Sequence, residues 1–314
     1  MGLTIGVDIG GTKVAAGVVD DAGRILQQVR RPTPSDNPAA VYSTLVDVLG
    51  ELVAQHRIDA IGLGVAGLID ETRTRVLFAA NLGWVDVPLR DQVEERTGLP
   101  TVLDDDANSA AWGEFRFGAG RDSSHLVMVT VGTGIGGGIV MGGVLHHGAF
   151  GGAADIGHMR VVPDGLACGC GSRGCWEQYA SGEALLRESR QLAAERQPEA
   201  TVLLGLGDGT PEGIHGPHIT AAARLGDPVA VAAFDYVGGW LGQGLADLSA
   251  VLDPACFVIG GGVSDAGDLL IAPARASYLL ALTTRECRSP AELRRAELGN
   301  DAGLVGAADL AQRR

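Results

Sequence analysis

Short apolar runs alternate with longer helical patterns along this chain of 314 residues. Apolar runs at residues 3–8 and 14–19 flank a Gly-rich turn, a pattern typical of a β-hairpin. Helices are expected at 38–56 and 228–252, because each stretch begins with Pro, which suits the first helical position. Strands that alternate with helices predict an α/β fold.

The opening pattern returns after residues 118–124, the most linker-like break in the chain. Residues 125–131 again read as a strand, 132–138 as a Gly-rich turn and 139–145 as a second strand. We interpret the repeat as two related halves with a ligand-binding cleft between them. The predicted domains are a smaller one, residues 1–118 with 298–314, and a larger one, residues 119–297.

Four further stretches carry expectations about secondary structure. Residues 76–84 read as a strand that runs into a loop, and residues 197–217 as an irregular, Gly-rich and exposed excursion. The glycines at 260–262 separate a buried strand from a helix that begins after Asp265. The last apolar segment, 302–311, predicts a short helix that packs on another element.

Charge and composition exclude several classes of protein. The formal net charge is −14, and no basic patch is visible that would bind nucleic acid or an anionic membrane. No apolar run approaches the length of a membrane-spanning helix, and the first residues lack the features of a signal peptide. The cysteine usage suits a reducing compartment, so we expect a cytoplasmic protein.

Residues 155–182 carry three of the five cysteines, Cys168, Cys170 and Cys175, with His158 close upstream. Together they offer four ligands for tetrahedral zinc, and the glycines between them let a short loop enclose one ion. Since four protein ligands leave no open position, the predicted site is structural. The alternative is a set of reduced, partly buried thiols, as is common for isolated cysteines.

Two Gly-rich turns, at 10–13 and 132–138, can present backbone N–H groups to an anion. Thr12 and Thr133 add hydroxyl donors, and the recurrence of such a turn in both halves favours phosphate binding. The second turn matches G-x-G-x-x-G, but a strand follows it where the dinucleotide fingerprint needs a helix. No Walker A sequence is present. Asp8 ends the first strand and could hold Mg²⁺ against nucleotide phosphates or cap the turn.

Asp104, Asp105 and Asp106 follow a predicted strand, and their mutual repulsion is expected to raise the pKa of at least one of them. A carboxylate with a raised pKa suits a general base that takes a proton from a hydroxyl. The alternative is that Asp106 caps the following helix. Further carboxylate, imidazole and amide side chains could join in binding several hydroxyls: Asn81, Asn108, Asp155, His158 and Glu177.

Taken together, these residues resemble the ROK family (repressors, open reading frames, sugar kinases), and within it the bacterial, particularly actinobacterial, glucokinases. The motifs are D-I-G-G-T-K at 8–13, D-D-A-N at 105–108, G-T-G-I-G-G-G at 132–138, G-H at 157–158 and C-x-C-G-x-x-G-C-x-E at 168–177. The resemblance implies an actin-like, ribonuclease-H-like pair of α/β domains with ATP in the central cleft. It also implies an ATP-dependent glucokinase that forms a homodimer or homotetramer.

The resemblance further implies roles for single residues. Asp106 matches the catalytic base that accepts the proton of the sugar 6-hydroxyl. Sugar contacts are implied for Asn81, Asp105, Asp155, His158 and Glu177. Zinc ligands are implied for His158, Cys168, Cys170 and Cys175. Contacts to Mg²⁺ and ATP are implied for Asp8, Gly10, Gly11, Thr12, Lys13, Thr133, Gly134 and Gly261.

Two positions depart from the usual glucokinase pattern. Asp105 stands where Asn is usual, and Asp155 stands where Glu is usual. An ionised carboxylate only accepts hydrogen bonds whereas an amide also donates, and Asp is one methylene shorter than Glu. Because both changes fall on the sugar side, we expect phosphoryl transfer to glucose with weakened sugar binding.

Three alternatives remain beside the glucokinase. One is a kinase for another hexose or an N-acyl hexosamine, or one that uses polyphosphate. Another is a sugar-sensing regulator, but ROK repressors carry a helix-turn-helix domain before the D-I-G-G-T motif, and Asp8 leaves no room for one. The third is a sugar-binding protein with weak or no kinase activity, which the presence of Asp106 disfavours.

Overall fold

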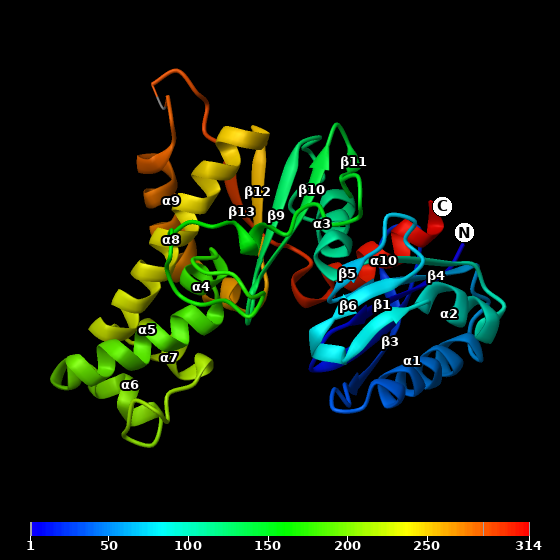
Figure 1. Cartoon of the computed structure of the whole chain (residues 1–314), viewed down its shortest axis with the longest axis horizontal. Helices are drawn as coiled ribbons and strands as arrows, with labels where there is room; N and C mark the ends of the chain where they lie inside the picture. Colours follow the sequence, from blue (N-terminus) through cyan, green and yellow to red (C-terminus); the bar gives the residue numbers. More distant parts are fainter. Residues whose placement is uncertain (1, 285, 314) are drawn as a thin grey trace. The chain divides into compact units, whose positions relative to one another are not determined.

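The chain folds into two compact units, whose elements are labelled in Figure 1. The computed structural model describes residues 2–284 and 286–313. The expected domain boundaries, after residues 118 and 297, stay a prediction. The first unit comprises Met1–Met128, Gly137–Ala154 and Ala296–Arg314, and the second unit comprises Val129–Gly136 and Asp155–Arg295.

A five-stranded sheet forms the centre of the first unit. Its strands are β1 Thr4–Ile9, β2 Lys13–Val19, β3 Ile25–Pro32, β4 Ala60–Val65 and β8 Thr101–Asp105. They lie in the order β3-β2-β1-β4-β8, with β1 antiparallel to β2, parallel to β4, and β4 parallel to β8. The expected opening hairpin is thus confirmed. Because β1, β4 and β8 run parallel, their carboxyl ends meet at one edge of the sheet.

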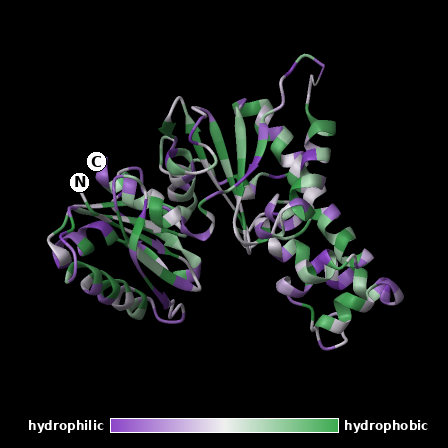
Figure 2. Ribbon diagram, turned by 180° about the vertical axis from the view of Figure 1, so that it is seen from behind, coloured by the Kyte–Doolittle hydropathy of each residue, from purple (hydrophilic) through white to green (hydrophobic). Residues whose placement is uncertain are grey.

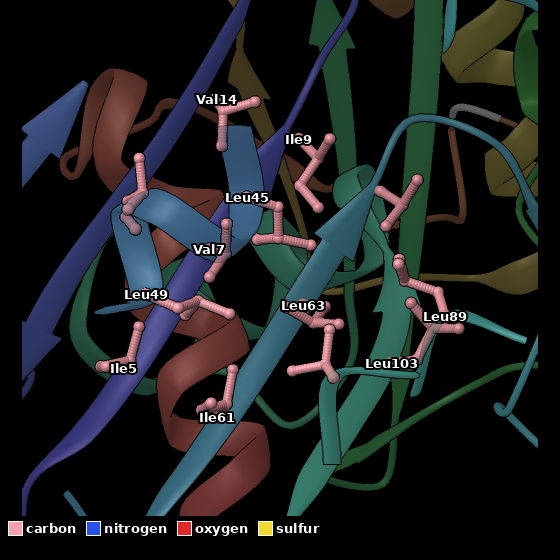
Figure 3. Packing of buried hydrophobic residues seen from close by; sticks show 14 of the residues in the cluster. Ile5, Val7, Ile9, Val14, Leu45, Leu49, Ile61, Leu63, Leu89 and Leu103 are labelled. Atoms are coloured by element: carbon pink, nitrogen blue, oxygen red, sulfur yellow. The ribbon is translucent and has the colours of Figure 1, made fainter. Parts of the chain in front are cut away.

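One face of this sheet is covered by α1 (Pro38–Val53) and α2 (Leu89–Thr97), and the main core of the unit lies there. Ile5 and Val7 of β1 point to this face because alternate side chains of a strand share one side. Both are fully buried in one cluster with Leu49 of α1 (Figure 3). The first helix expected from the sequence therefore forms and covers the first strand.

The opposite face of the sheet is covered by α3 (Asp106–Phe117) and α10 (Ala302–Gln312). The backbone of α10 approaches β1 and β4 closely because Gly6 and Gly62 lack side chains. A Cβ atom on either glycine would lie 1.8 Å from a carbonyl oxygen of α10. The short apolar helix expected at the end of the chain is confirmed, and the strands it packs on are now known.

A three-stranded sheet, β5-β6-β7, completes the first unit. Its strands are β5 Leu68–Ile69, β6 Val76–Ala79 and β7 Trp84–Val87. The strand expected within 76–84 exists as β6, but the expected loop after it is wrong, because η1 (Ala80–Leu82) and β7 follow. Gly83 ends η1 with φ 63°, a left-handed conformation that glycine adopts without strain, so the chain turns back and β7 pairs with β6.

The second five-stranded sheet has the order β11-β10-β9-β12-β13. Its strands are β9 Leu126–Val131, β10 Ile135–Met141, β11 Val144–Leu145, β12 Cys256–Gly260 and β13 Glu292–Arg295. Figure 2 shows β9 and β12 as strongly hydrophobic, in keeping with their burial. The division between the units passes through β9 and β10. Residues 132–134 join these two neighbouring strands, so the second Gly-rich turn connects two strands as expected.

The helices of the second unit gather around α8. They are α4 Glu177–Ala180, α5 Gly182–Glu195, α6 Thr201–Leu206, α7 Gly216–Arg224, α8 Pro228–Leu252 and α9 Asp268–Ala281. Asp227 caps α8, since its carboxylate accepts hydrogen bonds from the N–H groups of Val229 and Ala230, and the predicted start at Pro228 is confirmed. Among the helices that the structure describes, none combines the length and apolarity needed to cross a membrane.

Residues 197–217 are more ordered than expected. The prediction of an irregular excursion is wrong, because η3 (Gln197–Glu199) and α6 form within it. Leu203 is fully buried, and its N–H donates to Asp227 Oδ2 at 3.0 Å. This tertiary contact stabilises α6, which the sequence does not predict because the glycines around it are unfavourable for a helix. The remaining short helices are η2 Ile156–His158, η4 Gly262–Ala266 and η5 Gly299–Asp301.

Candidate active site and metal centre

Acidic side chains gather at the carboxyl edge of the first sheet. Asp8 of β1 lies opposite Gly64 of β4, which in turn lies opposite Asp104 of β8. Asp105 ends β8 and Asp106 begins α3. The parallel pairing of β1, β4 and β8 therefore brings Asp8 to the same edge as three consecutive carboxylates that lie about a hundred residues later in the sequence.

Asp105 is the N-cap of α3. Its Oδ1 accepts hydrogen bonds from the backbone N–H groups of Ala107 at 2.9 Å and Asn108 at 3.1 Å. The alternative in which Asp106 caps the helix is therefore wrong. A cap residue needs extended backbone, which Asp105 has, whereas Asp106 is already helical. Asp106 is left half-buried in the first turn, where the helix dipole favours a negative charge.

Three carboxyl groups at this edge, those of Asp8, Asp105 and Asp106, have raised pKa values. Burial, and after it the charge of Asp106, raises the pKa of Asp8 from 3.8 to about 7. Burial also raises the pKa of Asp106, and it raises that of Asp105 well above the usual value, with the charge of Asp106 adding to the effect. The expected rise is present, but desolvation contributes more than repulsion. A carboxylate with a raised pKa can take up a proton near neutral pH, as a general base must.

Asp104 is buried, and four donor groups surround its carboxylate. Its Oδ1 accepts from the Asp105 backbone N–H at 2.9 Å and from Asn108 Nδ2 at 3.1 Å. Its Oδ2 lies 2.7 Å from His147 Nε2 and 3.6 Å from Arg73 Nη1. The donor group of Asn108 is thus used inside the protein. Neither His147 nor Arg73 stood out in the sequence, because the contacts that mark them form only in the folded chain.

The first Gly-rich turn lies beside Asn81. The Gly10 N–H donates to the Lys13 carbonyl at 3.0 Å, which closes the turn. A Cβ atom on Gly11 would lie 2.8 Å from Asn81 Cβ, so the backbone of the turn packs directly against η1. Thr12 and Asn81 are both exposed. The first unit therefore brings Asn81 next to the turn proposed for phosphate.

The four predicted zinc ligands form one cluster in the second unit. The potential ligand atoms of His158, Cys168, Cys170 and Cys175 all lie within 4.8 Å of one another. Cys168 Sγ is 3.6 Å from His158 Nδ1, and Cys170 Sγ is 3.7 Å from Cys175 Sγ. A tetrahedral site with Zn–S bonds of about 2.3 Å requires S···S edges of about 3.8 Å. These two distances are close to the edges of such a site, so the four residues can serve as the ligands of a tetrahedral zinc ion.

The loop that carries the cysteines is held by hydrogen bonds around it. Arg160 and Cys175 form a β-bridge, and the Cys168 N–H donates to the Ser172 carbonyl at 2.9 Å. Beyond the last cysteine, the fully buried Trp176 donates through Nε1 to the Trp240 carbonyl at 2.8 Å. The metal loop is therefore anchored to α8, which contains Trp240.

Glu177 links the metal loop to the second Gly-rich turn. Its Oε2 accepts a hydrogen bond from the Ile135 N–H at 3.0 Å, and its Oε1 lies 3.9 Å from Cys168 Sγ. Asp155, by contrast, is exposed, and its Oδ1 lies 3.9 Å from His158 Nε2, beyond hydrogen-bond distance. Glu177, Asp155 and His158 all belong to the second unit, whereas Asp106 belongs to the first.

Gly261 and the second Gly-rich turn also lie close together. Gly261 has φ 81°, and a Cβ atom there would lie 2.5 Å from the Val131 carbonyl oxygen. The N–H of Gly182 at the start of α5 donates to the Gly132 carbonyl at 2.7 Å. Glycine at 261 thus allows the loop after β12 to pack on the end of β9, beside the turn that holds exposed Thr133.

Similarities to known proteins extend along the whole chain. A glucokinase of Streptomyces coelicolor is 53% identical over 312 residues, which cover 99% of this chain and 98% of that protein. An N-acetylmannosamine kinase of Escherichia coli is 35% identical and covers 98% of each chain. The structure of a ROK family glucokinase from Streptomyces griseus, solved with glucose and AMPPNP, has a TM-score of 0.93 with 53% identity, and 100% of each chain is covered. The expected actin-like α/β fold is confirmed by this likeness. Residues 4–314 match the ROK family, and the chain belongs to it.

Proposed function

We propose that this protein is an ATP-dependent glucokinase, which transfers the γ-phosphoryl group of ATP to the 6-hydroxyl of glucose. The observation that carries the proposal is the full-length 53% identity to a glucokinase, together with a TM-score of 0.93 to a glucokinase solved with glucose and AMPPNP. The raised pKa of Asp106 and the Gly-rich turns of both units agree with this chemistry.

Asp106 is the proposed general base. It stands at the first position of α3, half-buried, and burial raises its pKa. In the reaction Asp106 accepts the proton of the sugar 6-hydroxyl as that oxygen attacks the γ-phosphorus, and the bond from phosphorus to the bridging oxygen of ADP breaks. Positioning and charge neutralisation supply most of the rate in such transfers. Sugar contacts are proposed for Asn81 and Asp105 in the first unit and for Asp155, His158 and Glu177 in the second unit.

Nucleotide contacts are proposed for the Gly-rich turn of each unit. In the first unit these contacts come from Asp8, Gly10, Gly11, Thr12 and Lys13. In the second unit they come from Thr133, Gly134 and Gly261. A divalent cation suits Asp8, because an adjacent Mg²⁺ would favour the ionised form of a carboxylate whose pKa burial raises to about 7. The cation neutralises phosphate charge when it is bound.

Zinc is proposed as a structural ion held by His158, Cys168, Cys170 and Cys175, whose geometry fits a tetrahedral site. Its contribution is to fix the loop that presents Asp155, His158 and Glu177. We also propose a cytoplasmic homodimer or homotetramer, which rests on the resemblance to the family.

The main alternative is a kinase for another hexose or an N-acyl hexosamine, favoured by the N-acetylmannosamine kinase that is 35% identical. The test is a panel of sugars and phosphoryl donors with purified protein, in which ADP formation is followed by a coupled assay. We expect the highest kcat/KM with glucose and ATP. A higher kcat/KM with an N-acyl hexosamine would overturn the glucokinase assignment, and so would the absence of sugar-dependent ADP formation.

A further inference from the structure

His147 contacts Asp104, the first of the three consecutive aspartates at the proposed active site. The Asp104 side chain is buried, with its residue 2% exposed, and it accepts hydrogen bonds from two donors of the strand–helix junction. On its other oxygen, His147 Nε2 lies at 2.7 Å and Arg73 Nη1 at 3.6 Å. An ionised carboxylate donates nothing, so the imidazole must carry its proton on Nε2 in this contact. One carboxylate oxygen of Asp104 therefore contacts the junction of β8 and α3, and the other contacts His147 and Arg73.

The loop that carries His147 runs from residue 146 to residue 154. The His147 carbonyl accepts a hydrogen bond from the Ala153 N–H at 3.1 Å, so the loop closes on His147 itself. Within the loop, Gly151 packs against β5, since a Cβ atom there would lie 2.4 Å from the Ile69 carbonyl oxygen. His147 is therefore the point at which this loop is tied to the end of β8.

We propose that His147 is a positioning residue, which holds Asp104 and thereby fixes the orientation of the two carboxylates that follow it, Asp105 and Asp106. The inference rests on the glucokinase reaction proposed above. The physical basis is the chain of contacts from the imidazole to Asp104 Oδ2, and from Asp104 Oδ1 to the Asp105 N–H and to Asn108 on the first turn of α3. A shift of the Asp104 side chain would therefore displace the Asp105 N–H and the Asn108 side chain, which both donate to it.

Electrostatics gives the contact a second effect. Asp104, Asp105 and Asp106 are consecutive carboxylates, and Arg73 and His147 both face the first of them. A donor at Oδ2 stabilises the charge of Asp104 in its buried place, where an unpaired charge would be costly. Loss of the His147 donor therefore leaves Arg73, at the longer distance, as the remaining side-chain partner of that oxygen among the described residues.

The test uses a pair of matched amide variants. Gln places an N–H close to the position of imidazole Nε2, whereas Asn reaches only as far as Nδ1. In His147→Asn we expect kcat/KM for glucose to fall by about 10- to 100-fold, as for a misplaced catalytic group, with KM for ATP changed less than twofold. In His147→Gln we expect kcat/KM within threefold of the wild type. His146→Asn is the control, because His146 is exposed and its described contact is a backbone one.

The double variant Asp104→Asn with His147→Asn separates positioning from general destabilisation. If the pair acts as a unit, the double variant loses no more activity than Asp104→Asn alone. Equal kcat/KM values for His147→Asn and His146→Asn would overturn the inference. So would losses that follow only the melting temperature and that Gln does not rescue. A wild-type protein without glucose-dependent ADP formation would instead refute the proposed function, which keeps the two failures distinct.

Discussion

Glu177 Oε2 accepts a hydrogen bond from the backbone N–H of Ile135, at 3.0 Å. The contact joins Glu177, two residues after the last cysteine of the metal loop, to the first residue of β10, directly after the Gly-rich turn. Glu177, one of the proposed sugar ligands of the second unit, therefore also supports the proposed phosphate turn of that unit.

The variant Gly134→Ala tests the contact between Glu177 and Ile135. The new Cβ atom would lie 2.1 Å from Glu177 Oε2, so the carboxylate has to move. We expect the affinity for glucose, measured by calorimetry without nucleotide, to fall at least tenfold. Gly132→Ala is the matched control, because a Cβ atom there meets nothing within 4 Å. Equal glucose affinities in the two variants would contradict a role of Glu177 both in binding the sugar and in supporting the Gly-rich turn.

Removal of a metal ligand tests the proposed zinc site of the second unit. We expect about one zinc ion per wild-type chain by elemental analysis, and little in Cys175→Ser, which removes a buried ligand. The melting temperature should fall by about 5 °C or more in that variant, at about 2–4 °C per kcal/mol for a protein of this size. Cys287→Ser, at an exposed cysteine outside the cluster, should keep both the zinc and the melting temperature. Wild-type protein purified without zinc would refute the assignment.

Asp106→Asn tests the general base. The amide keeps the size of the side chain but cannot take up the proton, so kcat should fall by about 10²–10⁴-fold. Glucose affinity should change by less than about threefold, because Asp105 rather than Asp106 caps α3 and the helix start is preserved. A variant with wild-type kcat would remove Asp106 from the mechanism.

Asp105→Asn tests the departure from the usual family pattern. Asn retains an Oδ1 that can accept the hydrogen bonds from Ala107 and Asn108, so α3 remains capped. It adds an N–H donor toward the sugar, and one added hydrogen bond of about 0.5–1.5 kcal/mol lowers KM for glucose by about 2- to 12-fold. KM for ATP should stay constant. An unchanged KM for glucose would show that Asp105 does not weaken sugar binding.

Asp8 makes stability depend on pH. Its pKa is raised to about 7 by burial and then by the charge of Asp106. Below pH 4 the carboxyl is protonated in the folded and unfolded chains, and its contribution to stability is fully present. As the pH rises from about 4 to 7 this contribution is lost progressively, because the unfolded chain releases the proton near pH 4 whereas the folded chain holds it until about pH 7. Asp8→Asn lacks this titration.

We therefore expect the free energy of unfolding of Asp8→Asn to exceed that of the wild type at pH 8 by at most about 4 kcal/mol. The excess should shrink toward pH 4. Urea unfolding at pH 4, 6 and 8, without nucleotide or divalent cations, measures it. Parallel curves for the two proteins would contradict the raised pKa of Asp8.

Much of the architecture is readable from local sequence, because its causes are local. Apolar runs beside a Gly-rich turn form the β1–β2 hairpin, and Asn37 and Asp227 start the helices expected after them, since an N-cap acts on the next few residues. The metal cluster belongs here too, because His158 and Cys175 are close enough in the chain for one loop to bring them together.

Contacts between distant segments were decided by tertiary structure alone. His147 meets Asp104 across 43 residues, and Glu177 meets Ile135 across 42, so no local pattern marks either pair. β7 was missed because its pairing with β6 depends on the left-handed turn at Gly83, and α6 because Leu203 is buried only by its neighbours. The sequence also did not decide that Asp105 rather than Asp106 caps α3. The backbone angles at the end of β8 depend on its pairing with β4, and sequence spacing does not specify them.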